Sequence, residues 1–297
     1  MTAAAGLLTA AAGRRRRRRA IANRVMLGAA TVAAVIATIP LIWIVAYVAV
    51  QGLQAISLEF FTSVPTPVGV PGGGIANAIV GSFITVGLGT LLSVPVGLLV
   101  GLYAAARRDS RSGSAIRFLT DTIAGVPSIV MGIFAYTIIV LPQGHFSAFS
   151  GGVVLAFIML PIIVRSTEEM LHLVPSSLRE GSLALGAPEW RTSLRVVLPA
   201  AVSGIITGLM LAIARAAGEA APMLFTAFGN SSFSTDLQQP IATLPHTIYV
   251  YALSPYPDWQ EKAWGAALVL IVLVLAMNVI ARAVVGWRSR GMAGGSS

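Results

Sequence analysis

Three ionisable residues lie inside apolar stretches of this sequence, where charge is rarely tolerated. Arg165 stands in the run LPIIVRSTEEML, and Arg215 and Glu219 stand in AIARAAGEAAPMLFT. A charged side chain within a membrane span is costly unless it is paired or hydrated, so these residues are functional candidates. The planar guanidinium of arginine stays charged at any relevant pH and matches the geometry of a tetrahedral oxyanion. The three residues therefore predict a path for an anion.

Each candidate also has a purely structural interpretation. Arg215 and Glu219 are four residues apart, so on one helix face they would form an ion pair within the membrane. In such a pair, Glu219 would either hold Arg215 in place or compete with a bound anion. Arg165 lies near the end of its apolar stretch, where its side chain could reach the aqueous surface beside Glu168 and Glu169. The sequence leaves these interpretations open.

The composition of the chain indicates a membrane protein. Of the 297 residues, 56% are hydrophobic and only 10% are charged, and the mean hydropathy is +0.83. Soluble domains have about a quarter of their residues charged. The absence of cysteine excludes disulfides and thiolate metal sites, and we expect no metal and no cofactor. In a membrane protein the net charge of +9 indicates sidedness, so we expect no nucleic-acid partner.

Six apolar stretches are long enough to cross a membrane. They cover residues 25–50, 75–106, 118–141, 151–173, 200–228 and 263–285, and the third is interrupted by Pro127. The predicted fold class is therefore an all-α polytopic membrane protein with six transmembrane helices. Two small-residue motifs, Gly97-x-x-x-Gly101 and Gly204-x-x-x-Gly208, predict that some of these helices pack closely.

The basic residues predict the orientation of the chain. Seventeen of the 20 Lys and Arg residues fall in the first tail, in the loops after spans two and four, and at the C-terminal end. Lys262 alone falls in an opposite loop. Cytoplasmic loops are enriched in basic residues, so both termini are predicted to be cytoplasmic. The predicted divisions are a basic tail (1–24), a first membrane helix with an external loop (25–74), a membrane domain (75–286) and a second cytoplasmic tail (287–297).

A polar stretch, EGSLALGAPEWRTSLRVVLP at 180–199, separates spans four and five. Its residue types predict a short helix, a break at Gly186 and a second helix from about Pro188, because proline suits a first helical turn. Such an element could lie along a membrane face and offer one apolar side to a partner. An amphipathic connector without a partner is the alternative.

This stretch resembles the "EAA" loop of bacterial ABC importer permeases. In that family the loop is a cytoplasmic coupling helix that docks into a groove on an ATPase subunit. The residues that carry the resemblance are Glu180, Gly181, Ser182, Ala184, Gly186, Leu198 and Pro199. Gly181 and Ser182 replace the two alanines of the family pattern, so small residues are retained.

The sequence around spans four and five carries a more specific resemblance. The run ARxxGExAPxLFT resembles the PstA-type permease of phosphate-specific ABC importers, and the resemblance covers residues 75–285. It implies a type-I importer of the bacterial plasma membrane in which Arg165, Arg215 and Glu219 are candidates for the anion path. It also implies inorganic phosphate as cargo, a PstC-type sister permease, a dimer of PstB-type ATPase subunits, and an external PstS-type phosphate-binding protein.

Two other functions stay open at this point. A permease for sulfate, molybdate or another oxyanion fits the same arginines. An ion-coupled secondary carrier, in which Glu219 exchanges protons, would leave residues 180–199 without a role. The sequence has no Gly-x-x-x-x-Gly-Lys-Ser/Thr run, so any ATP would be hydrolysed by a partner and the chain is predicted to be a transport subunit rather than an enzyme.

Overall fold

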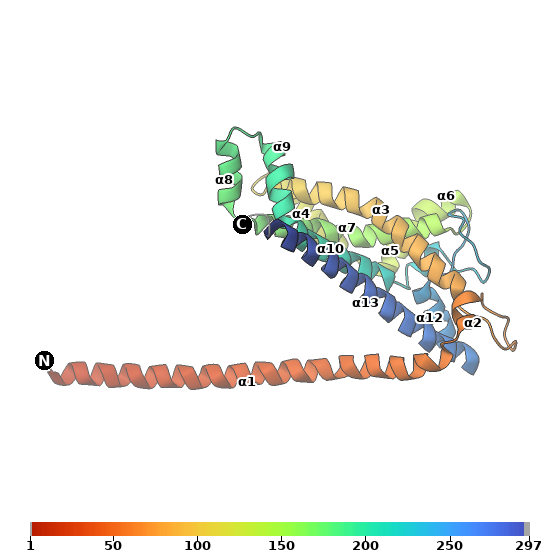
Figure 1. Ribbon diagram of the computed structural model, residues 1–297, viewed down its shortest axis with the longest axis horizontal. Coiled ribbons are helices and arrows are strands. Elements are labelled where there is room, and N and C mark those ends of the chain that lie inside the picture. Colours follow the sequence, from red (N-terminus) through yellow and green to blue (C-terminus); the bar gives the residue numbers. More distant parts are fainter. Residues whose placement is uncertain (1, 294–297) are drawn as a thin grey trace. The chain divides into compact units, whose positions relative to one another are not determined.

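The computed structural model describes residues 2–293, and the side chains of residues 19–283. In chain order the elements are α1 (Thr2–Ala55), α2 (Leu58–Thr62), α3 (Ala76–Ala106), α4 (Arg111–Ala124), α5 (Ser128–Ala135), the π-helix η1 (Tyr136–Val140), α6 (Leu141–Gln143), α7 (Ala148–His172), α8 (Ser176–Ala184), α9 (Glu189–Thr192), the π-helix η2 (Ser193–Val197), α10 (Leu198–Ala217), α11 (Met223–Thr226), α12 (Leu244–Ala252) and α13 (Pro257–Ala293) (Figure 1). The predicted all-helical fold class is confirmed. The chain separates into two compact units, Met1–Val50 and Gln51–Ser297, which are described separately.

The first unit is the greater part of the single helix α1. This helix runs unbroken through the arginine run and through Pro40. Within its segment Arg19–Ala55, a window of 18 residues reaches a mean hydropathy of 2.4, and the segment is long and apolar enough to cross a membrane. Most of its apolar side chains are exposed, with Trp43 at 72%. The predicted first membrane helix, residues 25–50, is therefore part of a longer helix.

The second unit contains four more helices that are long and apolar enough to cross a membrane. They are Ala76–Ala106, Ala148–His172, Glu189–Ala217 and Pro257–Ala283. The predicted third span, 118–141, is not a single straight helix. The helices Arg111–Ala124 and Ser128–Gln143 are bent by 99° around Pro127, because a residue preceding proline disfavours the helical conformation. The described residues thus give five spans, or six if this bent pair is one span.

The predicted fifth span, 200–228, is wrong at both ends. The continuous helix begins at Glu189 and stops at Ala217, where Gly218 is the C-cap. Pro222, which cannot continue a helix, precedes the short α11. The chain between them forms turns, so the last part of the expected span is a broken segment.

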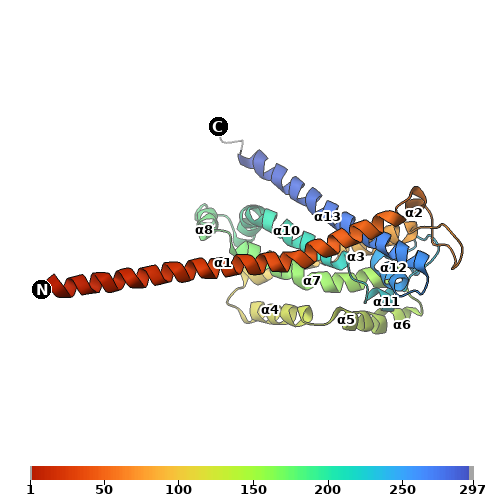
Figure 2. The same ribbon diagram turned by 90° about the horizontal axis from the view of Figure 1, so that it is seen from below.

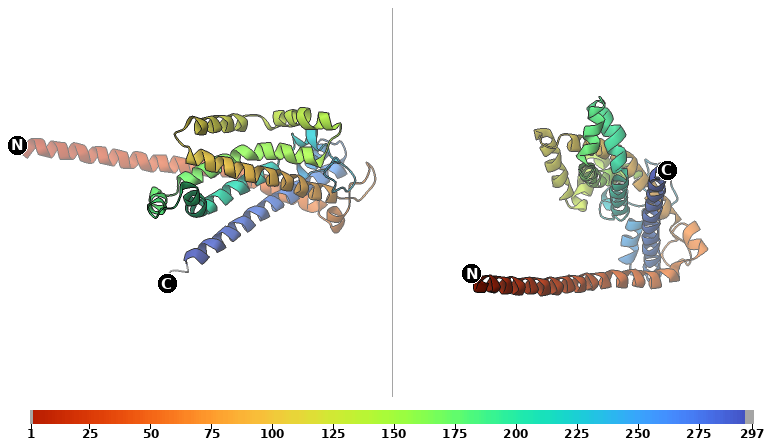
Figure 3. Two further views of the ribbon diagram at one scale, coloured as in Figure 1. Left: turned by 90° about the horizontal axis from the view of Figure 1, so that it is seen from above. Right: turned by 60° about the vertical axis from the view of Figure 1, so that its left-hand side comes forward.

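Helix α7 is the centre of the second unit. It lies between α3 and α10, with α4 to α6 on one side and α13 on the other (Figures 2 and 3). Within its most apolar window, 67% of α7 is buried, against 22% for α3 and for α13. The apolar part of α7 is therefore held between other helices.

Close packing of α3 on α7 depends on two glycines of the predicted small-residue motif. A Cβ atom on Gly97 would lie 2.6 Å from Ile163 Cγ2, and one on Gly101 would lie 2.7 Å from Thr167 Cβ. The prediction of close approach is confirmed here. Gly97 faces Ile163, and Gly101, four residues later, faces Thr167, which is four residues after Ile163. The two helices are therefore parallel.

Helix α10 uses its own two glycines against α7. A Cβ atom on Gly204 would overlap Met170, and one on Gly208 would overlap Ser166. This second motif also packs as predicted. Here the pairing runs in opposite directions, so α10 is antiparallel to α7.

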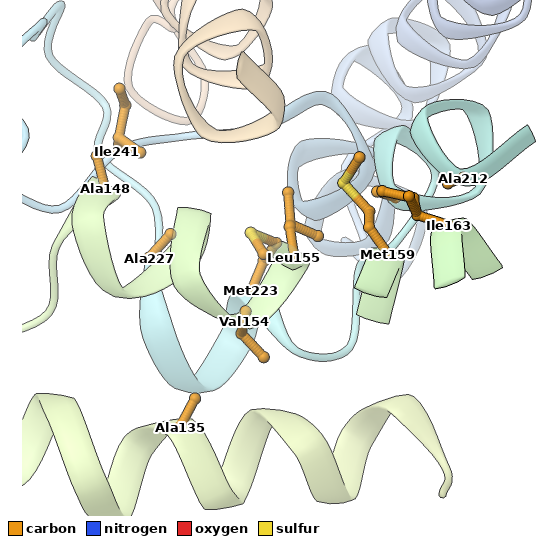
Figure 4. Packing of buried hydrophobic residues seen from close by; sticks show 11 residues of the cluster. Ala135, Ala148, Val154, Leu155, Met159, Ile163, Ala212, Met223, Ala227 and Ile241 are labelled. Atoms are coloured by element: carbon orange, nitrogen blue, oxygen red, sulfur yellow. The ribbon is translucent and has the colours of Figure 1, made fainter. Parts of the chain in front are cut away.

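The main core cluster joins α7 to α5, α10, α11 and the segment before α12. Figure 4 shows its side chains, which include Ala148, Val154, Leu155, Met159 and Ile163 of α7, Ala135 of α5, Ala212 of α10, Met223 of α11, and Ala227 and Ile241. Alanine and glycine at the helix contacts keep the backbones close, while the branched and thioether side chains fill the space between them.

Candidate functional site

The stretch 180–199 forms two short helices joined by a tight turn. Gly186 has φ +81°, a left-handed conformation that glycine adopts without strain. Its N–H donates to Leu183 O at 2.9 Å, and the N–H of Ala187 donates to Ser182 O at 3.3 Å. This pair of bonds is a Schellman motif, which ends α8. The predicted break at Gly186 is confirmed, and the second helix follows Pro188 as predicted.

The two short helices are linked by a hydrogen bond between side chains. The hydroxyls of Ser182 and Thr192 are 2.8 Å apart, and Thr192 is fully buried. Beyond Thr192 the helix continues through η2 into α10 without a break. Ser182, which replaces an alanine of the family pattern, therefore connects α8 to the start of the long helix through this hydrogen bond.

Large apolar side chains on this element are exposed. Leu185 is 90% exposed and Trp190 is 63% exposed, at the turn and just after it. Leu183 and Leu194 are also exposed, at 38% and 48%. Adjoining exposed apolar side chains rimmed by charged residues are typical of a protein interaction surface. At Glu180 and Gly181 the surface is open, and a Cβ on Gly181 would meet nothing within 4 Å.

Arg165 lies at the rim of a cluster of three carboxylates. Its guanidinium nitrogens are 3.4 Å from Glu169 Oε1, 3.7 Å from Glu168 Oε2 and 3.9 Å from Asp121 Oδ1. The Arg165 side chain is 42% exposed. These distances exceed those of good hydrogen bonds, so Arg165 is held loosely and keeps donors free for an anion.

Glu168 is the buried member of the same cluster. Its side chain is 3% exposed, and its Oε1 accepts a hydrogen bond of 2.9 Å from Arg117 Nη1 on α4. The other nitrogen of Arg117 donates to Arg108 O, which fixes the guanidinium. Glu168 Oε2 is buried without a hydrogen bond and faces Arg165. Sequence reasoning treated Arg117 only as a loop charge, because its partner is 51 residues away.

Arg215 and Glu219 form a loose ion pair. Arg215 Nε is 3.8 Å from Glu219 Oε1, and the two side chains are 60% and 16% exposed. Glu219 lies beyond the end of α10, in the turn after Gly218. The pairing agrees with the spacing, but the two residues do not share a helix face. The Arg215 guanidinium is therefore open to an incoming anion.

The helix register places the two arginines at different depths. Gly204 is opposite Met170 and Gly208 is opposite Ser166. Continued along the two antiparallel helices, this register places Arg215 at the level of residue 159 of α7. That level is six residues from Arg165, or about 9 Å along α7 at 1.5 Å per residue. The structure therefore brings Arg165 and Arg215 to two successive positions and not to one clamp.

At the opposite end from α8 and α9, a cavity of about 490 Å³ lies beside α12. His246 borders it, and burial lowers the pKa of His246 below its usual 6.5. Burial and the nearby carboxylate of Asp258 raise the pKa of Tyr251, a second lining residue, to about 12. Phe228 also borders the cavity and has φ +60°, a strained conformation for a non-glycine residue. Sequence reasoning missed this cavity, because its residues come from α3, α12, α13 and loops that are far apart in the sequence.

The sequence matches a known protein family. The family described as "Binding-protein-dependent transport system inner membrane component" matches residues 97–294. The phosphate transport system permease protein PstA of Yersinia pestis is 46% identical over 245 residues, which cover 82% of this chain and 83% of that protein. PstA of Haemophilus influenzae is 42% identical over 261 residues, covering 88% and 92% of the two chains. PstA 1 of Mycobacterium tuberculosis strain H37Rv is 37% identical over 252 residues, covering 83% and 82%.

The fold is similar to that of a solved transporter. The chain aligns with an inward-facing structure of the MetNI methionine ABC transporter at a TM-score of 0.61, covering 71% of this chain and 95% of that one. The sequence identity is 18%, so this likeness concerns the fold alone.

Proposed function

This chain belongs to the family of binding-protein-dependent transport system inner membrane components, multi-pass membrane permeases of ABC importers, and on that basis we propose that it forms half of the pathway of a phosphate importer. The observation that carries the proposal is 46% identity over 82% of the chain to a phosphate transport permease. Like its relatives, the chain is a transport subunit, and a partner hydrolyses the ATP. The assembly then contains this chain, a PstC-type sister permease, a dimer of PstB-type ATPase subunits and a PstS-type phosphate-binding protein outside.

The ATPase subunit docks on α8, α9 and the turn between them. These three parts face the cytoplasm, as do the termini. The exposed Leu185 and Trp190 supply apolar contacts for this partner. Glu180 and Gly181 present a charged group and a flat backbone surface beside them. The Schellman turn and the bond between Ser182 and Thr192 make the element stiff, so that motion of the partner moves it as one body.

One continuous helix connects this docking element to the anion path. The helix runs from Glu189 to Ala217, a length of 29 residues or about 43 Å. Trp190 lies near its cytoplasmic end and Arg215 lies in its last turn. Displacement of the docking element by nucleotide binding therefore tilts the end that carries Arg215, and the anion path changes from outside-open to inside-open.

The anion passes Arg215 first and Arg165 second. At each arginine the carboxylate partners are 3.4 to 3.9 Å away, too far for a strong bond, so phosphate can displace them. When phosphate leaves, Glu219 or the carboxylates around Arg165 neutralise the empty arginine. This exchange prevents a permanently bound anion, which would block transport.

The test is uptake of labelled phosphate by vesicles that contain the assembled complex. We expect uptake that requires ATP, resists excess sulfate, and falls at least tenfold in Arg215→Gln. Arg111→Gln, which removes an exposed arginine from α4, is the matched control and keeps the parent rate. Inhibition by sulfate or molybdate would indicate another oxyanion permease. Uptake by this chain alone, driven by an ion gradient without nucleotide, would show an ion-coupled carrier.

A further inference from the structure

A cavity of about 690 Å³ lies along α10 and α13 and does not include the arginines of the proposed anion path. Half of its lining residues have apolar side chains, namely Ile206, Met210, Leu211 and Ala214 on α10, Met170 on α7 and Ala281 on α13. Its volume is within the range of about 300–1,000 Å³ that is typical of small-ligand sites. Leu211 is 63% exposed, so the cavity is a groove on the surface of the helices.

The polar side chains in the groove are satisfied by their own helices, with one exception. Ser166 donates to Ile163 O, Thr207 donates to Ser203 O, and Asn278 donates to Val274 O. Arg282 has no hydrogen bond or ion pair to any residue whose side chain the structure describes. The groove therefore combines an aliphatic surface with one unneutralised cation.

The position of Arg282 matches the boundary of a membrane. Arg282 lies in the last turn of the apolar stretch 263–285, and two more arginines, Arg288 and Arg290, follow that stretch. Gly204, which also lines the groove, lies six residues from the start of α10, at the end of α10 that is nearer the docking element. A phosphate diester at this level would meet Arg282, while acyl chains would extend along the aliphatic surface towards the centre of the membrane.

We propose that the groove between α10 and α13 is a binding site for an anionic phospholipid, with its headgroup phosphate on Arg282 and an acyl chain against Leu211 and Met210. Free phosphate would gain nothing from the aliphatic walls, because an ion loses hydration there without compensation. The first helix of a second copy would also fail to neutralise Arg282, because residues 1–55 contain no Asp or Glu and carry seven arginines.

The site has a consequence for the long helix. A lipid wedged between α10 and α13 supports the middle of the helix that joins the docking element to Arg215. Bound lipid should therefore raise the thermal stability of the complex, since a ligand that binds only the folded state stabilises it.

The experiment measures lipid retained by the assembled complex, by native mass spectrometry, after reconstitution with equal phosphatidylglycerol and phosphatidylcholine. The parent should retain the anionic lipid preferentially. Arg282→Gln should reduce that preference about fivefold, the effect of one interfacial cation. Thr207→Trp, which fills the groove and leaves the charge, should also reduce retention. Arg111→Gln should change nothing, and excess inorganic phosphate should not displace the lipid.

Three results would overturn the proposal. One is equal retention of both lipids by the parent, and another is displacement of the lipid by inorganic phosphate. The third is occupation of the groove by the sister permease. Because the chain has no cysteine, a single Thr207→Cys change allows specific crosslinking. A crosslink to the sister chain in high yield, without retained lipid, would identify a protein occupant.

Discussion

Arg117 on α4 and Glu168 on α7 form a hydrogen-bonded ion pair, with 2.9 Å between Arg117 Nη1 and Glu168 Oε1. The carboxylate is 3% exposed, so it is almost wholly removed from water. The pair connects the bent segment α4 to α6 with the central helix. It also places the second oxygen of Glu168 beside Arg165, so one buried carboxylate positions two arginines.

Removal of one partner of this pair should be strongly destabilising. We expect Glu168→Ala to lower the free energy of unfolding by about 3 kcal/mol, because Arg117 is then left without its counter-charge. The double change Arg117→Met with Glu168→Met should recover most of the loss. Thermal unfolding of the purified complex measures both effects. Glu169→Gln, at a side chain that is 58% exposed, is the control and should change stability by less than about 0.5 kcal/mol. Equal losses in the single and double variants would contradict this account.

Two glycines of α3 should respond in opposite ways to the same substitution. A Cβ on Gly101 would lie 2.7 Å from Thr167 Cβ and 2.9 Å from Val164 O, so Gly101→Ala should destabilise by about 1–3 kcal/mol. A Cβ on Gly87 meets nothing within 4 Å, so Gly87→Ala should stabilise by about 0.5–1 kcal/mol through its helix propensity. The measurement is the unfolding midpoint of each variant. If both variants shifted it in the same direction, the close packing of α3 on α7 would be in doubt.

The turn at Gly186 should be sensitive to backbone strain. Its Cβ position is open, but its φ of +81° costs about 1–2 kcal/mol for most residues. Asparagine tolerates this conformation better than alanine. We therefore expect ATP-dependent uptake to fall in the order Gly186, Gly186→Asn, Gly186→Ala. An alanine variant with uptake at or above that of the asparagine variant would argue against a strained turn at the docking element.

His246 should make stability depend on pH. Burial lowers its pKa in the folded protein below the unfolded value of 6.5. The unfolded state therefore binds the proton more readily, and stability should fall as pH drops below about 6.5. His246→Gln should reduce the loss of stability between pH 7.5 and 5. The matched control His145→Gln, at an exposed histidine, should leave that loss unchanged. Unfolding midpoints between pH 7.5 and 5 test this. If the unfolding midpoint of His246→Gln depended on pH as much as that of the parent, other groups would be responsible for the pH dependence.

The sequence predicted features that depend on neighbouring residues along the chain. Apolar run lengths gave the positions of the long helices, because a helix in lipid must satisfy its own backbone and cover about 30 Å. Gly186 and Pro188 gave the break and restart of the helix at the docking element. Pairs of glycines four residues apart correctly predicted the close contacts of α3 and α10 with α7.

The tertiary structure decided what depends on distant residues. The register of α10 against α7 sets Arg165 and Arg215 at different depths, and no spacing within one segment encodes that register. The burial of Glu168 and its bond to Arg117 join residues 51 positions apart. The unneutralised charge of Arg282 becomes visible only when α13 is placed beside α10. The local sequence shows which charged residues lie within a membrane span, because the length and hydropathy of the surrounding segment decide whether it spans the membrane. Which charges meet is fixed by helix packing, because that sets the distances on which their energies depend.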